Sequence, residues 1–164
     1  AQFIYTYRFS DSEKKEYWNM AAKFLLLGVG ILRIQCFLDG CCWGKVTSSV
    51  FAITVTNSES MTPLLGVPLH PTQLYESALG FALFFLMMKV EKYKVSLIPI
   101  TLLSYSLGRF FIEFFRGDEI RGVNLLYGLS TGQILSVTLF LSIIIFYSPW
   151  NKGRDLVLRA KLIG

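Results

Sequence analysis

The sequence predicts an all-α integral membrane protein, with about four transmembrane helices and a small extracytoplasmic loop region. Of the 164 residues, 53% are hydrophobic and the mean hydropathy is +0.50, which is too apolar for an ordinary soluble domain. Apolar stretches alternate with polar or basic loops along the whole chain. The net charge of +5 does not indicate nucleic-acid binding, because the basic residues lie at the ends of the apolar stretches, where they act as topology signals.

Each predicted helix has its own start or anchor signal. Ser10 and Glu13 form a capping-box pattern ahead of the first apolar stretch, and Trp18 is a typical interface anchor. Pro71 suits the first turn of the second helix. We expect one membrane domain, residues 1–164, with spans at about 18–34, 74–89, 95–115 and 129–147.

Two loops separate the first two spans. Residues 33–45, RIQCFLDGCCWGK, interrupt the apolar run with two glycines and an aspartate, which favours a turn that re-enters or caps the membrane. Residues 46–69 are polar. Within them Phe51, Ile53 and Val55 alternate with small or polar residues, which predicts one edge of a short β-hairpin.

The basic residues predict the topology. They gather in both terminal segments and in the 89–94 loop, so the positive-inside rule places both termini in the cytoplasm. Five polar residues from different spans and loops then fall at one depth near the outer face, which indicates a functional cavity. They are Arg33, His70, Glu76, Arg109 and Glu113.

The densest charge inside an apolar stretch lies in residues 104–116, SYSLGRFFIEFFR. Arg109, Glu113 and Arg116 are spaced by four and three, so they share one helix face, which Tyr105 extends by a turn. Arginine forks match phosphate and carboxylate oxygens, so the face could be an anion-binding wall. The alternative is a structural arginine–glutamate pair near the membrane surface.

His70 is the single histidine of the chain. It could act as a general base or contact an anion, or it could be a packed or solvated residue before a proline. Glu76 and Glu113 could serve as bases or could orient the arginines.

The three cysteines, Cys36, Cys41 and Cys42, follow a C-x4-C-C spacing. This is not the usual C-x2-C form of zinc sites, so we expect no metal and no cofactor. A disulfide between Cys36 and Cys42 on an oxidising outer face is a possible alternative. A further alternative is a metal-binding or redox membrane protein built on the three cysteines.

Four segments together resemble one protein family. RIQCFLDGCCWGK, LHPTQLYES, GRFFIEFFRGDE and GLSTGQILS occur in the order and rough spacing of the bacterial prolipoprotein diacylglyceryl transferase family, and the first resembles a branch with paired cysteines after a glycine. The resemblance implies a multi-pass enzyme of the bacterial cytoplasmic (inner) membrane that acts in lipoprotein biosynthesis. Such an enzyme moves the diacylglyceryl group of phosphatidylglycerol to the lipobox cysteine thiol of a prolipoprotein, and glycerol phosphate leaves. The implied partners are phosphatidylglycerol, the prolipoprotein signal peptide and membrane lipid, with no nucleic acid.

The resemblance also implies roles for particular residues. Catalytic roles are implied for Arg33, Arg109 and Glu113, and His70, in the second signature, could serve as the base only if it reaches the thiol. Substrate-binding roles are implied for Gly44, Gln73, Tyr75, Glu76, Arg116 and Gln133.

The chain departs from the family pattern in three ways. Leu32 and Gln35 replace glycines, and Cys36 and Cys41 stand where some members have asparagine and glutamate. The family's essential histidine lies in an HGG-type loop before the first signature, and this sequence has no such loop. The family also has additional amino-terminal spans, whereas four spans are expected here. We therefore expect either the carboxy-terminal part of a longer enzyme or a shortened, non-catalytic relative that binds anionic phospholipid or a membrane partner.

Overall fold

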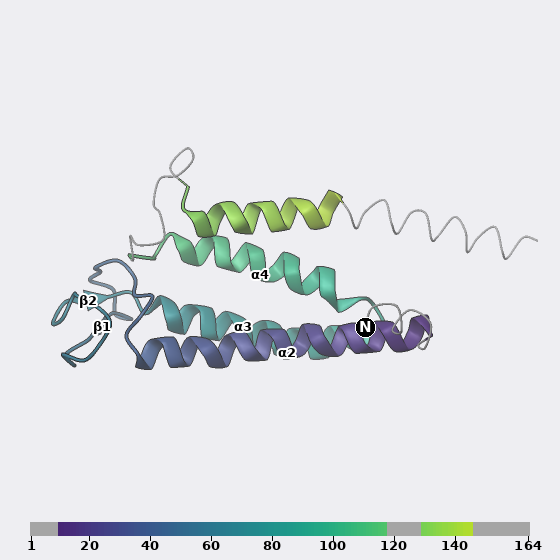
Figure 1. Ribbon diagram of the computed structural model, residues 1–164, viewed down its shortest axis with the longest axis horizontal. Coiled ribbons are helices and arrows are strands. Elements are labelled where there is room, and N and C mark those ends of the chain that lie inside the picture. The colour runs from purple at the N-terminus through teal and green to yellow at the C-terminus, as the bar shows by residue number, and fades with distance from the viewer. Residues whose placement is uncertain (1–9, 118–128, 146–164) are drawn as a thin grey trace, which may run out of the picture.

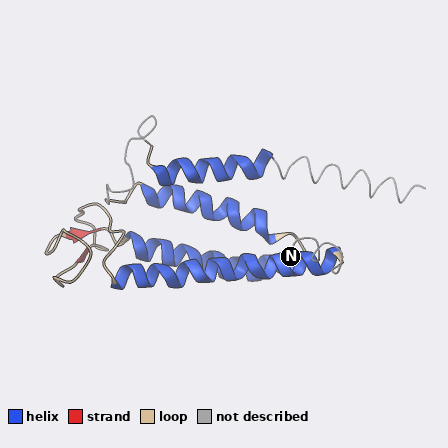
Figure 2. Cartoon of the chain, in the orientation of Figure 1, coloured by secondary structure: helices blue, strands red, loops and turns tan. Residues whose placement is uncertain are grey.

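The computed structural model describes residues 10–117 and 129–145, and it is mostly helical (Figure 1). Helices α2 and α3 lie side by side, α4 lies next to them, and a further helix follows α4. The two short strands gather with the loops at one end of this bundle (Figure 2). The elements are α2 (Asp11–Leu38), β1 (Ile53–Thr54), β2 (Pro68–Leu69), α3 (Thr72–Val90), the 3-10 turn η1 (Glu91–Tyr93), α4 (Leu97–Glu113) and the helix Thr131–Ile145.

We name the two ends of the bundle by their connections. The loop end holds residues 39–71, which join α2 to α3, together with the end of α4. The turn end holds residues 91–96, which join α3 to α4. The predicted polar loop at 117–127 falls almost wholly outside the described residues, as do residues 146–147 of the last predicted span.

Two helices are long and apolar enough to cross a membrane, judged by length and composition: α2, and the continuous stretch Thr72–Tyr93. α4 has 17 residues, and Thr131–Ile145 is a shorter apolar helix. Large apolar side chains project from α2, including Phe24 and Leu32, each 60% exposed. Such a surface suits contact with lipid. The all-α membrane class is thus supported, and the count of four spans stays a prediction.

The start of α2 follows its sequence signal. The Ser10 hydroxyl accepts a hydrogen bond from the Glu13 backbone N–H at 3.3 Å, and the Ser10 N–H donates to Glu13 Oε2 at 2.7 Å. This reciprocal pair satisfies two amide groups that a helix start leaves without partners. The predicted capping box is confirmed.

The end of α2 differs from the prediction. The helix continues four residues past the expected end at residue 34, to Leu38. None of the four added residues is a glycine or proline, so nothing local breaks the helix there. Gly40, with φ of +70°, is the first residue that adopts the left-handed conformation in which helices commonly end.

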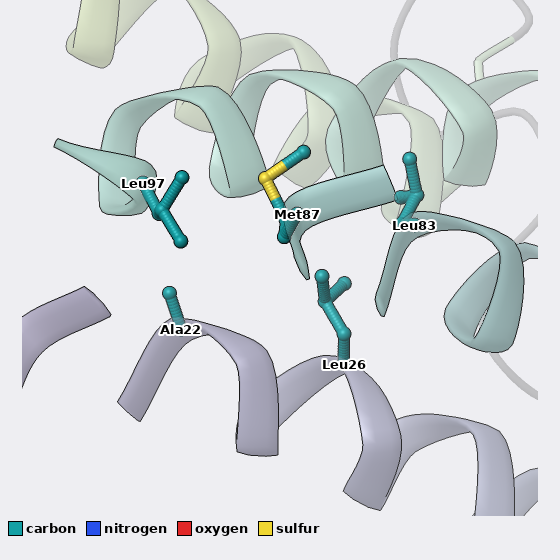
Figure 3. Packing of buried hydrophobic residues seen from close by; sticks show 5 residues of the cluster. All are labelled: Ala22, Leu26, Leu83, Met87 and Leu97. Atoms are coloured by element: carbon teal, nitrogen blue, oxygen red, sulfur yellow. The ribbon is translucent and has the colours of Figure 1, made fainter. Parts of the chain in front are cut away.

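Small residues let α2 and α3 approach closely. A Cβ on Gly80 would lie 2.9 Å from Gly30 N, and the Ser77 hydroxyl donates to Gly30 O at 2.8 Å. Close backbone contact of this kind is a common basis of helix association in membranes. Towards the turn end, a small apolar cluster fills the space between α2, α3 and α4 (Figure 3). Its members are Ala22, Leu26, Leu83, Met87 and Leu97.

The loop end is joined by backbone pairing. β1 and β2 are antiparallel, with Ile53 opposite Leu69. The pair is only two residues long on each side, so a hairpin stays a prediction. A second junction is more extensive: residues 43–47 pair on one side with 68–70 and on the other with 115–117.

Glycine makes the second junction possible. The Gly44 N–H donates to His70 O at 3.0 Å, and the Lys45 N–H donates to Phe115 O at 2.8 Å. A Cβ on Gly117 would lie 2.7 Å from Gly44 O, which a side chain could not tolerate. The segment after α4 is therefore fixed against the segment after α2.

The turn end uses different groups. The Asn19 amide donates to Val95 O at 3.0 Å and accepts from the Leu97 N–H at 2.8 Å. Asn19 therefore caps α4 from another helix, in the place of Ser96, which makes no side-chain cap. Beside it, Lys23 Nζ lies 2.6 Å from Glu91 Oε2.

Candidate functional site

Glu76 is the centre of a buried charge cluster at the loop end. It lies in the second turn of α3 and is only 1% exposed. Its carboxylate pairs with Arg33 from α2, with Arg109 from α4 at 3.0 Å, and with Arg116 at 3.5 Å. One carboxylate thus holds guanidinium groups from three separate segments.

Glu113 extends the cluster along α4. Its carboxylate pairs with Arg109 one turn earlier and lies 4.0 Å from Arg116 Nε. The Ser130 hydroxyl donates to Glu113 Oε1 at 2.9 Å. Arg109 and Glu113 share a face of α4 as predicted, but Arg116 lies beyond the helix end, where its backbone is bridged to Gly44, and it contacts Glu113 from there.

Arginine outnumbers glutamate in this cluster: among the described residues, three guanidinium groups face two carboxylates. The five side chains are between 1% and 19% exposed. Because charge interactions are weakly screened at such depth, these guanidinium groups would interact strongly with an anion. We call these five residues the arginine cluster: Arg33, Glu76, Arg109, Glu113 and Arg116.

The start of the helix Thr131–Ile145 supports Glu113. Ser130 and Gln133 form a capping pair: the Ser130 N–H donates to Gln133 Oε1 at 3.0 Å, and the Gln133 N–H donates to the Ser130 hydroxyl at 3.2 Å. A Cβ on Gly132 would lie 2.7 Å from the Glu113 carboxyl carbon. The carboxylate therefore sits directly against a helix amino terminus, where negative charge is favoured.

His70 lies beside the arginine cluster in an aromatic setting. Its Nδ1 is 3.1 Å from the Tyr75 hydroxyl, and its ring packs edge-on against Phe115 with centroids 5.1 Å apart. His70 and Gln73 also line a small, mostly apolar pocket between the end of α2, the segment after it and the two short strands. The other lining residues are Phe37, Gly40, Trp43, Ile53, Val55, Leu69 and Pro71.

The cysteine group adjoins the arginine cluster through Arg33. Arg33 Nη1 is 3.9 Å from Cys42 Sγ, and none of the three sulfurs is in a disulfide. Burial, together with hydrogen bonds to Cys36 and Cys42, raises the pKa of the Cys41 thiol to about 12. Without a further partner the Cys41 thiol therefore stays protonated at neutral pH.

The structure brings together half of the ten predicted site residues in the arginine cluster. Gln133 reaches it through Ser130, and Gly44 is paired with Arg116 through the backbone. Gln73, Tyr75 and His70 lie in the neighbouring loop region, where Gln73 Nε2 donates to Cys41 O at 2.5 Å. The roles proposed for these residues stay predictions.

Two contacts of the cluster were not predicted. Ser130 binds Glu113, and Gly132 leaves the space that the Glu113 carboxylate fills. A sequence signal for Ser130 exists, because S-x-x-Q before an apolar run is a capping box. Gly132 has no such signal, since its importance depends on contact with a distant helix.

Comparison with known proteins identifies the family. The model of the prolipoprotein diacylglyceryl transferase family matches residues 1–148. Over 150 residues the chain is 36% identical to phosphatidylglycerol–prolipoprotein diacylglyceryl transferase 2 of Clostridium perfringens, covering 85% of this chain and 57% of that protein.

Other relatives give the same result. The phosphatidylglycerol–prolipoprotein diacylglyceryl transferase of Clostridium tetani is 35% identical over 143 residues, which cover 81% of this chain and 55% of the relative. The corresponding protein of Campylobacter lari is 34% identical over 145 residues, covering 84% and 50%. The chain thus spans about half the length of these curated relatives. It belongs to the prolipoprotein diacylglyceryl transferase family.

Proposed function

We propose that this protein transfers the diacylglyceryl group of phosphatidylglycerol to the lipobox cysteine thiol of prolipoproteins. The arginine cluster is the observation that carries the proposal. It buries three guanidinium groups among the helices of a membrane protein, and their forks match the phosphate oxygens of an anionic phospholipid headgroup.

The reaction needs fixed positive charge at the departing group. The peptide sulfur attacks the glyceryl carbon that carries the phosphate oxygen, a carbon–sulfur bond forms, and the carbon–oxygen bond breaks. Glycerol phosphate leaves with the bonding electron pair, so negative charge grows on its oxygens. Arg33 and Arg109 are the groups we assign to this charge, since their forks suit phosphate oxygens.

The remaining members of the cluster position these two arginines. Glu76 holds both of them, and Glu113, backed by Ser130, holds Arg109 from the other side. Arg116 adds a third positive group. For the proton of the attacking thiol we assign His70 as acceptor, with Tyr75 orienting its ring.

We also propose how the protein lies in the membrane. It is a multi-pass protein of the bacterial inner membrane, in which α4 and the helix Thr131–Ile145 add two spans to α2 and α3. Both termini face the cytoplasm, and the loop end, with its short hairpin, faces outward. The distribution of basic residues supports this orientation.

A second candidate function is lipid binding without transfer. It is favoured by the position of His70, whose described side-chain contacts are with Tyr75 and Phe115 rather than with the arginine cluster. Such a protein would bind an anionic headgroup or a membrane partner but leave a lipobox thiol unmodified.

Transfer can be measured with a lipobox peptide and vesicles that contain phosphatidylglycerol. Mass spectrometry of the peptide detects the added diacylglyceryl group. We expect Arg33→Ala and Arg109→Ala each to lower the rate by about 100-fold or more, as loss of one charge-stabilising group does in other enzymes. Lys45→Ala is the matched control, because it removes an exposed positive charge at the same end.

The outcomes separate the two candidates. Unchanged labelling in both arginine variants would refute the assignment of the cluster. Anionic-vesicle binding that depends on Arg109, without any peptide modification, would establish the second function instead.

A further inference from the structure

The three thiols form one compact group at the loop end, although their spacing in the sequence did not predict this. The sulfur atoms of Cys36, Cys41 and Cys42 all lie within 4.8 Å of one another. Cys42 is 7% exposed, and the other two are partly buried. We propose that these thiols bind a single thiophilic metal ion as thiolates, and that the ion is monovalent copper.

The backbone is shaped to bring the sulfurs together. Cys36 lies in the last turns of α2, and the Cys41 N–H donates to Cys36 O at 3.1 Å, which folds the chain back over the helix end. Gly40 and Cys42 both have positive φ, +70° and +61°. For a residue other than glycine this conformation is unfavourable and persists only where the surroundings impose it.

Helix α3 imposes that conformation. The Thr72 hydroxyl donates to Cys42 O at 2.7 Å, and Gln73 Nε2 donates to Cys41 O at 2.5 Å. Both carbonyls of the cysteine pair are thus held by the first turn of α3. The thiol group is therefore a fixed arrangement between two helices and does not depend on a loose loop.

The dimensions fit a three-coordinate site. A metal–sulfur bond of about 2.3 Å places three sulfurs roughly 4.0 Å apart around a central ion. The observed limit of 4.8 Å needs a closure of less than about 1 Å, which rotation of cysteine side chains can supply.

The electrostatics also fit. Three thiolates around a monovalent ion carry surplus negative charge, and Arg33 Nη1 already lies 3.9 Å from Cys42 Sγ. A guanidinium group at this distance stabilises a thiolate, and a bound cation would stabilise all three.

The choice of copper follows from the ligand set. Within the described residues, no histidine, aspartate or glutamate joins the three thiols as a fourth ligand. Zinc in structural sites takes four ligands in a tetrahedron, whereas soft thiolates select monovalent copper. The three sulfurs that this part of the structure offers therefore favour copper.

The test is a competition titration on the purified protein, kept anaerobic and reduced. Monovalent copper is supplied on a coloured chelator, and loss of colour reports transfer to the protein. We expect one copper per chain, and we expect maleimide-reactive thiols to fall from three to none when copper is bound. A parallel titration uses divalent zinc.

Variants locate the site. Cys41→Ser and Cys36→Ser should each weaken copper binding by about 100-fold or more, because two thiolates hold the ion less tightly than three. Met61→Leu is the matched control: it removes an exposed sulfur near the same loop, and its backbone bond to Asp39 is retained. Circular dichroism checks that each variant keeps its helices.

Several results would overturn the proposal, and the thiol count on the unmodified protein makes it testable even if a variant fails to fold. Thiols that stay reactive in the presence of copper would refute it, as would copper binding that survives the cysteine substitutions. A disulfide in the reduced preparation, or zinc binding without copper binding, would also contradict it.

Discussion

The two ends of the helical bundle both carry polar groups, but they satisfy them in opposite ways. At the turn end, one neutral amide, Asn19, meets one backbone acceptor and one backbone donor, and the pair Lys23–Glu91 is balanced. At the loop end, the arginine cluster is buried more deeply, and among the described residues its guanidinium groups outnumber its carboxylates. One balanced pair and one neutral amide are enough to join helices, so we infer that the larger network at the loop end serves the proposed ligand.

The largest expected effect comes from removing the centre of the cluster. Glu76→Gln keeps the shape of the side chain but leaves three buried guanidinium groups with one carboxylate. We expect the free energy of unfolding to fall by about 3–5 kcal/mol, the usual cost of breaking a buried ion pair. Unfolding in mixed micelles measures this loss.

Glu91→Gln is the matched control for that substitution, because it removes a carboxylate from the more exposed pair at the other end. Equal losses at Glu76 and Glu91 would erase the contrast between the two ends.

A smaller effect is expected where Glu113 meets the last helix. In Gly132→Ala the new Cβ would lie 2.7–2.8 Å from the Glu113 carboxyl group, so the carboxylate must move. We expect a loss of about 1–3 kcal/mol from overpacking, with a larger fractional loss of transfer activity, because Arg109 loses its orientation. Gly28→Ala is a suitable control, since nothing lies within 4 Å of a Cβ at that position. Full activity in Gly132→Ala would show that the position of Glu113 does not matter.

Asn19→Ala tests the turn end. It removes the tertiary cap from α4, and we expect the free energy of unfolding to fall by about 1–2 kcal/mol, as for loss of a helix cap. Transfer activity in the folded protein should be unchanged, because Asn19 lies at the opposite end of the bundle. A loss of activity at full stability would mean that the two ends are coupled.

The smallest effect is expected for Lys23→Met. The Lys23 and Glu91 side chains are 20% and 38% exposed, and pairs that remain accessible to solvent contribute only about 0–1 kcal/mol. The measurement is again unfolding in mixed micelles, with and without added salt. A salt-sensitive loss above about 2 kcal/mol would show that this pair resembles the buried cluster after all.

Local signals predicted most of the helices and one side of the site. The capping box at Ser10 and the spacing of Arg109, Glu113 and Arg116 are properties of a few neighbouring residues, and both are seen in the structure. The central place of Glu76 could not be predicted, because its partners lie far from it in the sequence, in α2 and in the stretch 104–116.

The cysteine group could not be predicted, because it depends on the backbone conformation. Nothing in the sequence shows that Cys42 adopts a positive φ. That conformation, together with the hydrogen bond from Thr72 of α3, accompanies the close approach of the three sulfurs. The spacing rule for zinc sites therefore led to the expectation of no metal, while the folded loop offers three sulfurs in one place.

The backbone junction at the loop end has a consequence for protein engineering. The Thr47 N–H donates to Pro68 O at 3.0 Å, and Val46 is bridged to Leu69, so the residues at the two ends of the intervening segment are neighbours in space. That segment, residues 48–67, forms a side loop with an exposed tip at residues 56–59. We expect an insertion at the tip to leave Gly44 and Arg116 in place, so an affinity tag there would leave the charged end of the bundle intact.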